Sequence, residues 1–101
     1  MIKEFEFRKV EYKLPNIPQA MELLGELGIN ADGTYQIGQF ALMAKMIRQL
    51  DKFITTIDCD FEGVKVDSFE GLINQFEAMG ILSEISGEIL NKLNMSSKKK
   101  L

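Results

Sequence analysis

Apolar and charged residues alternate over the first fourteen residues, a pattern typical of half-buried β-strands. The apolar positions change from odd to even numbers across Arg8-Lys9. A two-residue turn at this point would bring the apolar side chains of both strands to one face, so we predict a β-hairpin over residues 1–14. The four side chains that would then share a face are Phe5, Phe7, Val10 and Tyr12.

Two segments in the first half of the chain carry apolar residues at helical spacing. Asn16 and Pro18 suit the start of the first helix, and Gly28 suits its C-terminal end. The second helix is predicted over residues 34–53, and its apolar residues cover more than one face, as in a central helix that is contacted on two sides. One face would carry Ile37, Phe40, Ala44 and Ile47, and another would carry Met43 and Met46.

Alternation returns over residues 55–67 and predicts a second short hairpin with its turn at Glu62-Gly63. Asp67 and Glu70 then have the spacing of a capping box and predict the start of a helix. We expect Gly80 to end this helix and Ser83 to cap a further one.

The predicted elements amount to one domain, since 101 residues is close to the usual domain size. We predict an α+β fold, a mainly helical single domain over residues 1–94 with an N-terminal β-hairpin and a candidate second hairpin. Residues 95–101 include Lys98-Lys99-Lys100 and lack an apolar period, so we expect a frayed, Lys-rich tail.

Composition excludes several kinds of chemistry. The chain has no histidine, which removes His-based nucleophile pairs and His-ligated zinc, and its one cysteine excludes an intramolecular disulfide. Twelve basic and fifteen acidic residues give a net charge of −3, which disfavours binding to nucleic acid. We therefore predict a non-enzymatic protein with no cofactor.

Neither a targeting segment nor a membrane span is visible in the sequence. No apolar core follows the charged first residues, and the longest run without a charge, residues 33–44, is shorter than the about 20 residues needed to cross a bilayer. We predict a cytoplasmic location without membrane association.

The sharpest local motif is the acidic segment over residues 58–63, with Asp58, Asp60 and Glu62 at the spacing of an EF-hand loop. Position 12 of such a loop supplies a bidentate glutamate, but here it is Phe69. We therefore favour a strand over a calcium site. Cys59 shares its parity with neighbouring apolar residues and is expected in the core.

Methionine and phenylalanine on the helical stripes allow two interpretations. These side chains can fill a core, or they can line a groove for a partner helix, because flexible Met-rich surfaces accept varied apolar ligands. If they form a groove, the candidate partner-binding residues are Phe40, Met43, Met46, Ile47, Phe76 and Met79.

Three segments together resemble a known family in their layout. They are the aromatic, charged opening FEFRKVEYKLP, the helix IPQAMELLGELG and the helical end FEGLINQFEAMGILSEISGEILNKL. In this layout the chain resembles the small tail assembly chaperones of long-tailed bacteriophages. The resemblance implies a non-enzymatic protein of the host cytoplasm that coats apolar helical segments of the tape-measure protein and recruits tail-tube subunits. It carries over no catalytic motif.

Two other classes stay open from the residues alone. One is a small oligomeric adaptor, a homo-oligomer that self-associates through the same apolar stripe. The other is a metal-regulated switch that uses the acidic segment.

We predict that calcium does not stabilise this protein. The ligand that normally closes an EF-hand loop is missing at Phe69, so millimolar calcium should leave the melting temperature unchanged. Differential scanning fluorimetry with calcium and with EDTA measures this, and a rise of several degrees in calcium would mean that the acidic segment binds metal.

Overall fold

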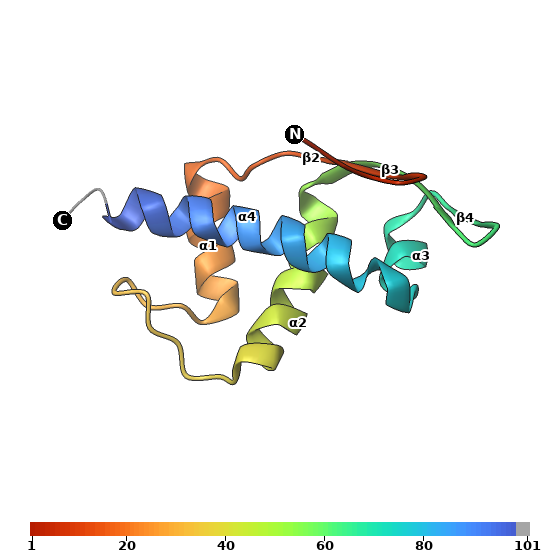
Figure 1. Cartoon of the computed structure of the whole chain (residues 1–101). Coiled ribbons are helices and arrows are strands. Elements are labelled where there is room, and N and C mark those ends of the chain that lie inside the picture. Colours follow the sequence, from red (N-terminus) through yellow and green to blue (C-terminus); the bar gives the residue numbers. More distant parts are fainter. Residues whose placement is uncertain (99–101) are drawn as a thin grey trace.

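A computed structural model describes the backbone of residues 1–98, together with the side chains of these residues other than Phe5 and 94–98. In chain order the elements are β1 (Ile2–Phe5), β2 (Arg8–Tyr12), α1 (Ile17–Leu27), α2 (Gln39–Gln49), the 3₁₀ helix η1 (Leu50–Lys52), β3 (Ile54–Phe61), β4 (Val64–Val66), α3 (Phe69–Ile73), the 3₁₀ helix η2 (Phe76–Ala78) and α4 (Met79–Lys98). The strands form one antiparallel sheet in the order β1-β2-β3-β4, and the helices lie on one side of it (Figure 1). The predicted α+β class is confirmed.

The N-terminal hairpin is present, but its turn lies two residues earlier than predicted. Phe5 pairs with Arg8, so the turn consists of Glu6 and Phe7 rather than Arg8-Lys9. Phe7 therefore leaves the sheet; it has a positive φ of 60° and is 78% exposed. Arg8 is free to pair in the sheet, and the outcome corrects the expectation that Phe7 faces the core.

The second hairpin is confirmed, with its turn at Glu62-Gly63. Both turn residues have positive φ values, 53° and 89°, which is the geometry that matches the twist of a tight hairpin. The Asp60 carboxylate accepts a hydrogen bond from the backbone N–H of Gly63 at 2.8 Å. Part of the acidic segment thus has a structural role in closing this turn.

Alternation along the strands produces one buried and one wet face. Cys59 is 1% exposed, which confirms its predicted place in the core. It lies one register step from a bulge-free pairing of β3 with β4, opposite Val66. The other buried side chains of the sheet are Val10, Tyr12, Phe61 and Val66.

The ends of α1 follow the sequence prediction. Asn16 caps the helix: its side chain accepts from the backbone N–H of Gln19, and the Gln19 side chain accepts from the backbone N–H of Asn16. Gly28 ends the helix in the left-handed conformation, which a residue without a Cβ adopts at low cost. This arrangement satisfies backbone groups that would otherwise lack partners.

The second helix starts later than predicted, at Gln39 instead of residue 34. Residues 30–37 form a loop in which the backbone N–H and the hydroxyl of Thr34 donate to the Asp32 carboxylate at 3.0 and 2.6 Å. These bonds lower the pKa of Asp32 and compete with helix formation over this segment. The helix ends at Gln49 and continues as η1.

The C-terminal helices are divided at a different point from the one predicted. The hydroxyl of Ser68, not Asp67, caps α3 by accepting from the backbone N–H of Gly71 at 3.1 Å. The chain breaks at Gln75, which is extended, whereas Gly80 lies within the first turn of α4. Ser83 is inside α4, which runs through Lys98 and thus beyond the predicted limit at 94; residues 99–101 of the predicted tail lie outside the described residues.

The core lies between the sheet and the helices, and α4 runs along the middle of it (Figure 1). Each large aliphatic side chain that is fully buried there contributes about 1.5–3 kcal/mol relative to an exposed position. Those with less than 2% exposure are Leu27, Met46, Leu50, Leu72, Ile85, Ile89 and Val10.

We predict that Phe7→Gly increases stability. The substitution removes the steric cost of a positive φ and loses little apolar burial, so the free energy of unfolding should rise by about 0.5–1 kcal/mol in urea denaturation. Glu6→Gly is the matched control, because Glu6 is not at a positive φ, and it should lower the free energy of unfolding by a similar amount. A loss of stability in Phe7→Gly would show that the Phe7 ring makes a contact that holds the hairpin.

Candidate functional site

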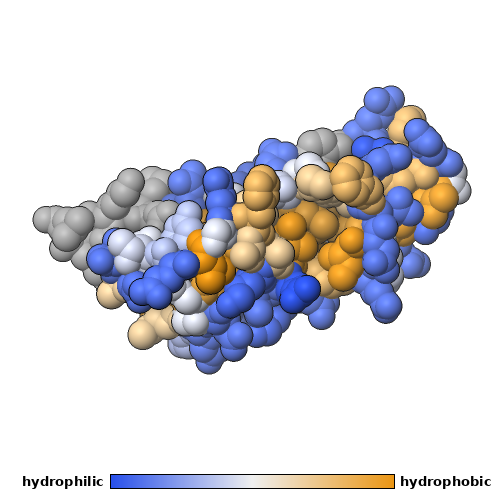
Figure 2. Space-filling view, turned by 90° about the horizontal axis from the view of Figure 1, so that it is seen from below, coloured by the Kyte–Doolittle hydropathy of each residue, from blue (hydrophilic) through white to orange (hydrophobic). Residues whose placement is uncertain are grey.

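The side of the helical layer that faces away from the sheet exposes large apolar side chains. Phe40 at the start of α2 is 92% exposed, and Phe76 in η2 is 83% exposed. Ile73 at the end of α3 and Met79 at the start of α4 are about half exposed. Figure 2 shows a band of hydrophobic surface on this side, bordered by hydrophilic residues. We call these four residues the apolar surface.

Five of the six candidate residues from the sequence are accessible to a partner. Phe40, Phe76 and Met79 belong to the apolar surface, and Met43 and Ile47 are partly buried beside it on α2. Met46 is 0% exposed, so it cannot contact a partner while the fold is intact. We therefore reassign Met46 from the candidate site to the core.

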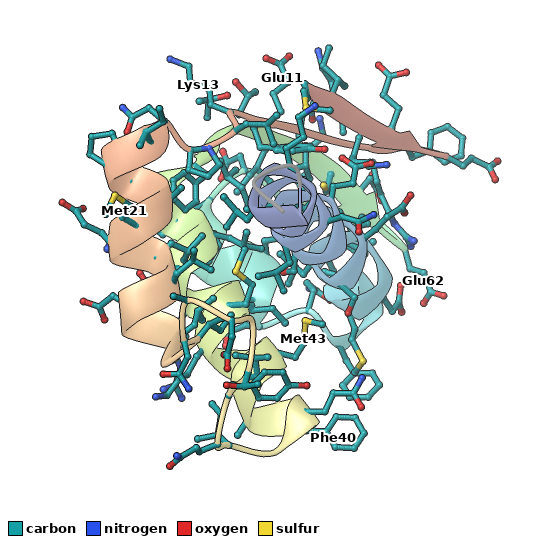
Figure 3. The ribbon with its side chains drawn as sticks, turned by 90° about the vertical axis from the view of Figure 1, so that its left-hand side faces the viewer. Glu11, Lys13, Met21, Phe40, Met43 and Glu62 are labelled. Carbon is teal, nitrogen blue, oxygen red and sulfur yellow. The ribbon has the colours of Figure 1, made fainter. Side chains whose placement is uncertain are left out.

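The orientation of α2 explains this difference. Its inward side is formed by Leu42, Met46 and Leu50, which are four residues apart and therefore lie on one side of the helix. Phe40 and Ala44, which the sequence stripe had placed inward, are exposed. Figure 3 shows Phe40 pointing away from the protein at the lower end of α2, with Met43 nearer to α4.

Met43 also lines a hollow of about 240 Å³ between the loop after α1, the start of α2 and α4. Tyr35 and Gln39 supply polar groups to it, and the aliphatic residues come from three separate elements. The sequence analysis missed this hollow, because no local signal indicates that the loop packs against α4. Its aliphatic members are Ile29, Leu42 and Leu90.

An ion pair positions η2 and with it Phe76. The Arg8 guanidinium contacts the Glu77 carboxylate at 3.2 Å, and it lies over the Phe61 ring at 4.4 Å from the centroid. Arg8 thereby links the sheet to η2 by an ion pair and a cation–π contact. The residue next to Phe76 is thus held in place, so the exposed ring extends from a fixed segment.

A second polar cluster attaches α4 to the N-terminal hairpin. Lys3 contacts Glu84 at 3.0 Å and also pairs with Glu88, and the Tyr12 hydroxyl donates to Glu88. The hydrogen bonds to Glu88 and then Glu84 raise the pKa of Lys3, so its ammonium stays charged at neutral pH. A permanently charged, paired lysine is suited to holding two elements together and not to proton transfer.

The acidic segment and Cys59 offer little for metal or nucleophilic chemistry. Asp58 and Asp60 belong to β3, and the residues that the structure describes contain no group of three His, Cys, Asp or Glu side chains that could hold a metal ion. Burial raises the pKa of the Cys59 thiol, which keeps it protonated and poorly nucleophilic. Within residues 1–98, no helix combines the length and the apolar character that a membrane crossing requires.

Comparison with known proteins adds no relative to this picture. The chain matches no family model, no curated protein and no solved structure. The apolar surface and its supports are therefore the basis for assigning a function.

We predict that Met46 and Phe40 differ sharply in their contribution to stability. Met46→Ala removes a fully buried side chain and should lower the free energy of unfolding by about 2–4 kcal/mol. Phe40→Ala removes an exposed side chain and should change it by less than about 0.5 kcal/mol. Urea denaturation of both variants measures this, and equal losses would mean that Phe40 packs in the core.

Proposed function

We propose that this protein is a non-enzymatic assembly chaperone of a long-tailed bacteriophage. In this proposal it works in the host cytoplasm, where it binds apolar helical segments of the tape-measure protein, keeps them soluble and recruits tail-tube subunits. The layout of the sequence suggests this role, and the observation that carries it is the exposure of Phe40 and Phe76 on one side of the helical layer.

Two almost fully exposed phenylalanines are unfavourable for an isolated domain. Each leaves apolar area in water that burial would stabilise by about 1.5–3 kcal/mol, although the same chain buries other aromatic and aliphatic residues almost completely. Contiguous exposed apolar surface is typical of protein-binding sites. The exposed rings therefore support a function in which another protein covers them.

A helical ligand fits this surface better than an extended one. The four apolar residues come from helices and not from a strand edge, and an amphipathic helix presents anchors at three- and four-residue spacing to such a surface. Met79 and the partly buried Met43 have flexible side chains, which can adapt to successive turns that are not identical. A chaperone for a long helical protein needs this tolerance.

Co-expression with a tape-measure segment tests the proposal. The wild-type protein should keep the segment in the supernatant, and the double variant Phe40→Ser/Phe76→Ser should lose most of this effect, because it removes both aromatic anchors. Met21→Ser is the matched control: Met21 is also 69% exposed, but it lies on α1, on the opposite side from Phe40 (Figure 3).

Three outcomes would contradict the proposal. The segment could stay insoluble with the wild-type protein, or the double variant could solubilise it equally well. The wild-type protein could also be a dimer in analytical ultracentrifugation that the double variant dissociates, which would favour the self-associating adaptor.

A further inference from the structure

The exposed side of α2 carries two cations next to the apolar surface. Lys45 and Arg48 are both exposed, and neither forms an ion pair with the side chains that the structure describes. By contrast, Lys3, Arg8 and Lys9 each pair with a glutamate. The positive charge on α2 is therefore available to a partner.

Helix geometry places Arg48 beside the apolar surface. Eight residues separate it from Phe40, which corresponds to a rotation of roughly 80° about the helix axis. Ala44 lies between them, four residues from each, and its small exposed side chain allows close approach to the backbone. A helix that covers Phe40 and Ala44 would have one of its flanks next to Arg48.

The charges near the other end of the apolar surface have the opposite sign. Glu70 on α3 is exposed, and Glu77 in η2 is partly neutralised by Arg8. Lys52, the next cation after Arg48, lines a shallow hollow together with Glu22 of α1, so its charge is opposed within the protein. Arg48, with Lys45 farther around the helix, is thus the principal positive group at the edge of the surface.

We propose that the helix bound by the apolar surface has an acidic flank beside its apolar stripe and that Arg48 recognises this flank. This inference rests on the proposed function and specifies the chemistry of the partner. The net charge of the protein is −3, so general electrostatic attraction would not draw in an acidic helix. Preference for such a helix therefore has to come from the local charge on α2.

Two synthetic peptides test this charge preference. Each is an amphipathic helix of about 20 residues, long enough to span a small domain, with a leucine stripe, glutamines on one flank and either glutamates or lysines on the other. Fluorescence anisotropy should show that the wild-type protein binds the glutamate peptide about threefold to tenfold more tightly, with a difference that shrinks as salt is added.

Arg48→Glu should reverse the preference, because it replaces attraction of the glutamate flank by repulsion and attracts the lysine flank. Lys65→Glu is the matched control: it makes the same change of charge on β4, where Lys65 lines a hollow with Asp58 and Asp60, and should leave the preference unchanged. Far-UV circular dichroism of each variant checks that the fold is intact.

The outcomes separate this inference from the proposed function. If the wild-type protein binds both peptides equally and Arg48→Glu changes neither affinity, the acidic-flank inference is wrong and helix binding stands. If Lys65→Glu abolishes the preference as effectively as Arg48→Glu, net charge rather than Arg48 determines it, and the inference is again wrong. If the wild-type protein binds neither peptide, the proposed function itself fails.

Discussion

The burial of α4 is the interaction on which the rest of the structure depends. This one helix places Ile81, Ile85 and Ile89 in the core and packs against α2, while Glu84 and Glu88 on the same helix contact the N-terminal hairpin. The sheet is too small to be stable by itself, because its inward face needs a covering layer. Without α4, the largest part of that layer would be missing and the remaining helices would have little to pack against.

The same arrangement explains why apolar side chains stay exposed. An α-helix buries one stripe well, and α4 uses its stripe on the inward side of α2 and on the sheet. Phe40 and Phe76 lie beyond its reach, at the start of α2 and in the short helix before α4. A domain of this size has no further element to place over them, so the binding surface is the part of the helical layer that α4 leaves uncovered.

The sequence predicts those features that depend on neighbouring residues. The cap at Asn16, the left-handed end at Gly28 and the tight turn at Glu62-Gly63 are all local, and each was correctly identified. The first hairpin turn was misplaced because Phe7 has an apolar side chain at a position where a turn residue is expected. The buried side of α2 was also misassigned, since Phe40 and Met46 are both apolar and only tertiary packing distinguishes them. The hollow at Met43 depends on the contact of a loop with α4, which no sequence period reveals.

The position of α4 in the chain order also affects how the protein folds during synthesis. Ribosomes release the chain from its N-terminus, and the Lys3–Glu84 contact joins residues that are 81 positions apart. The N-terminal hairpin therefore leaves the ribosome long before the helix that covers it, and contacts of such large sequence separation form slowly. During this interval the inward faces of the sheet and of α2 are exposed together, so the nascent chain passes through a stage in which it is itself vulnerable to aggregation.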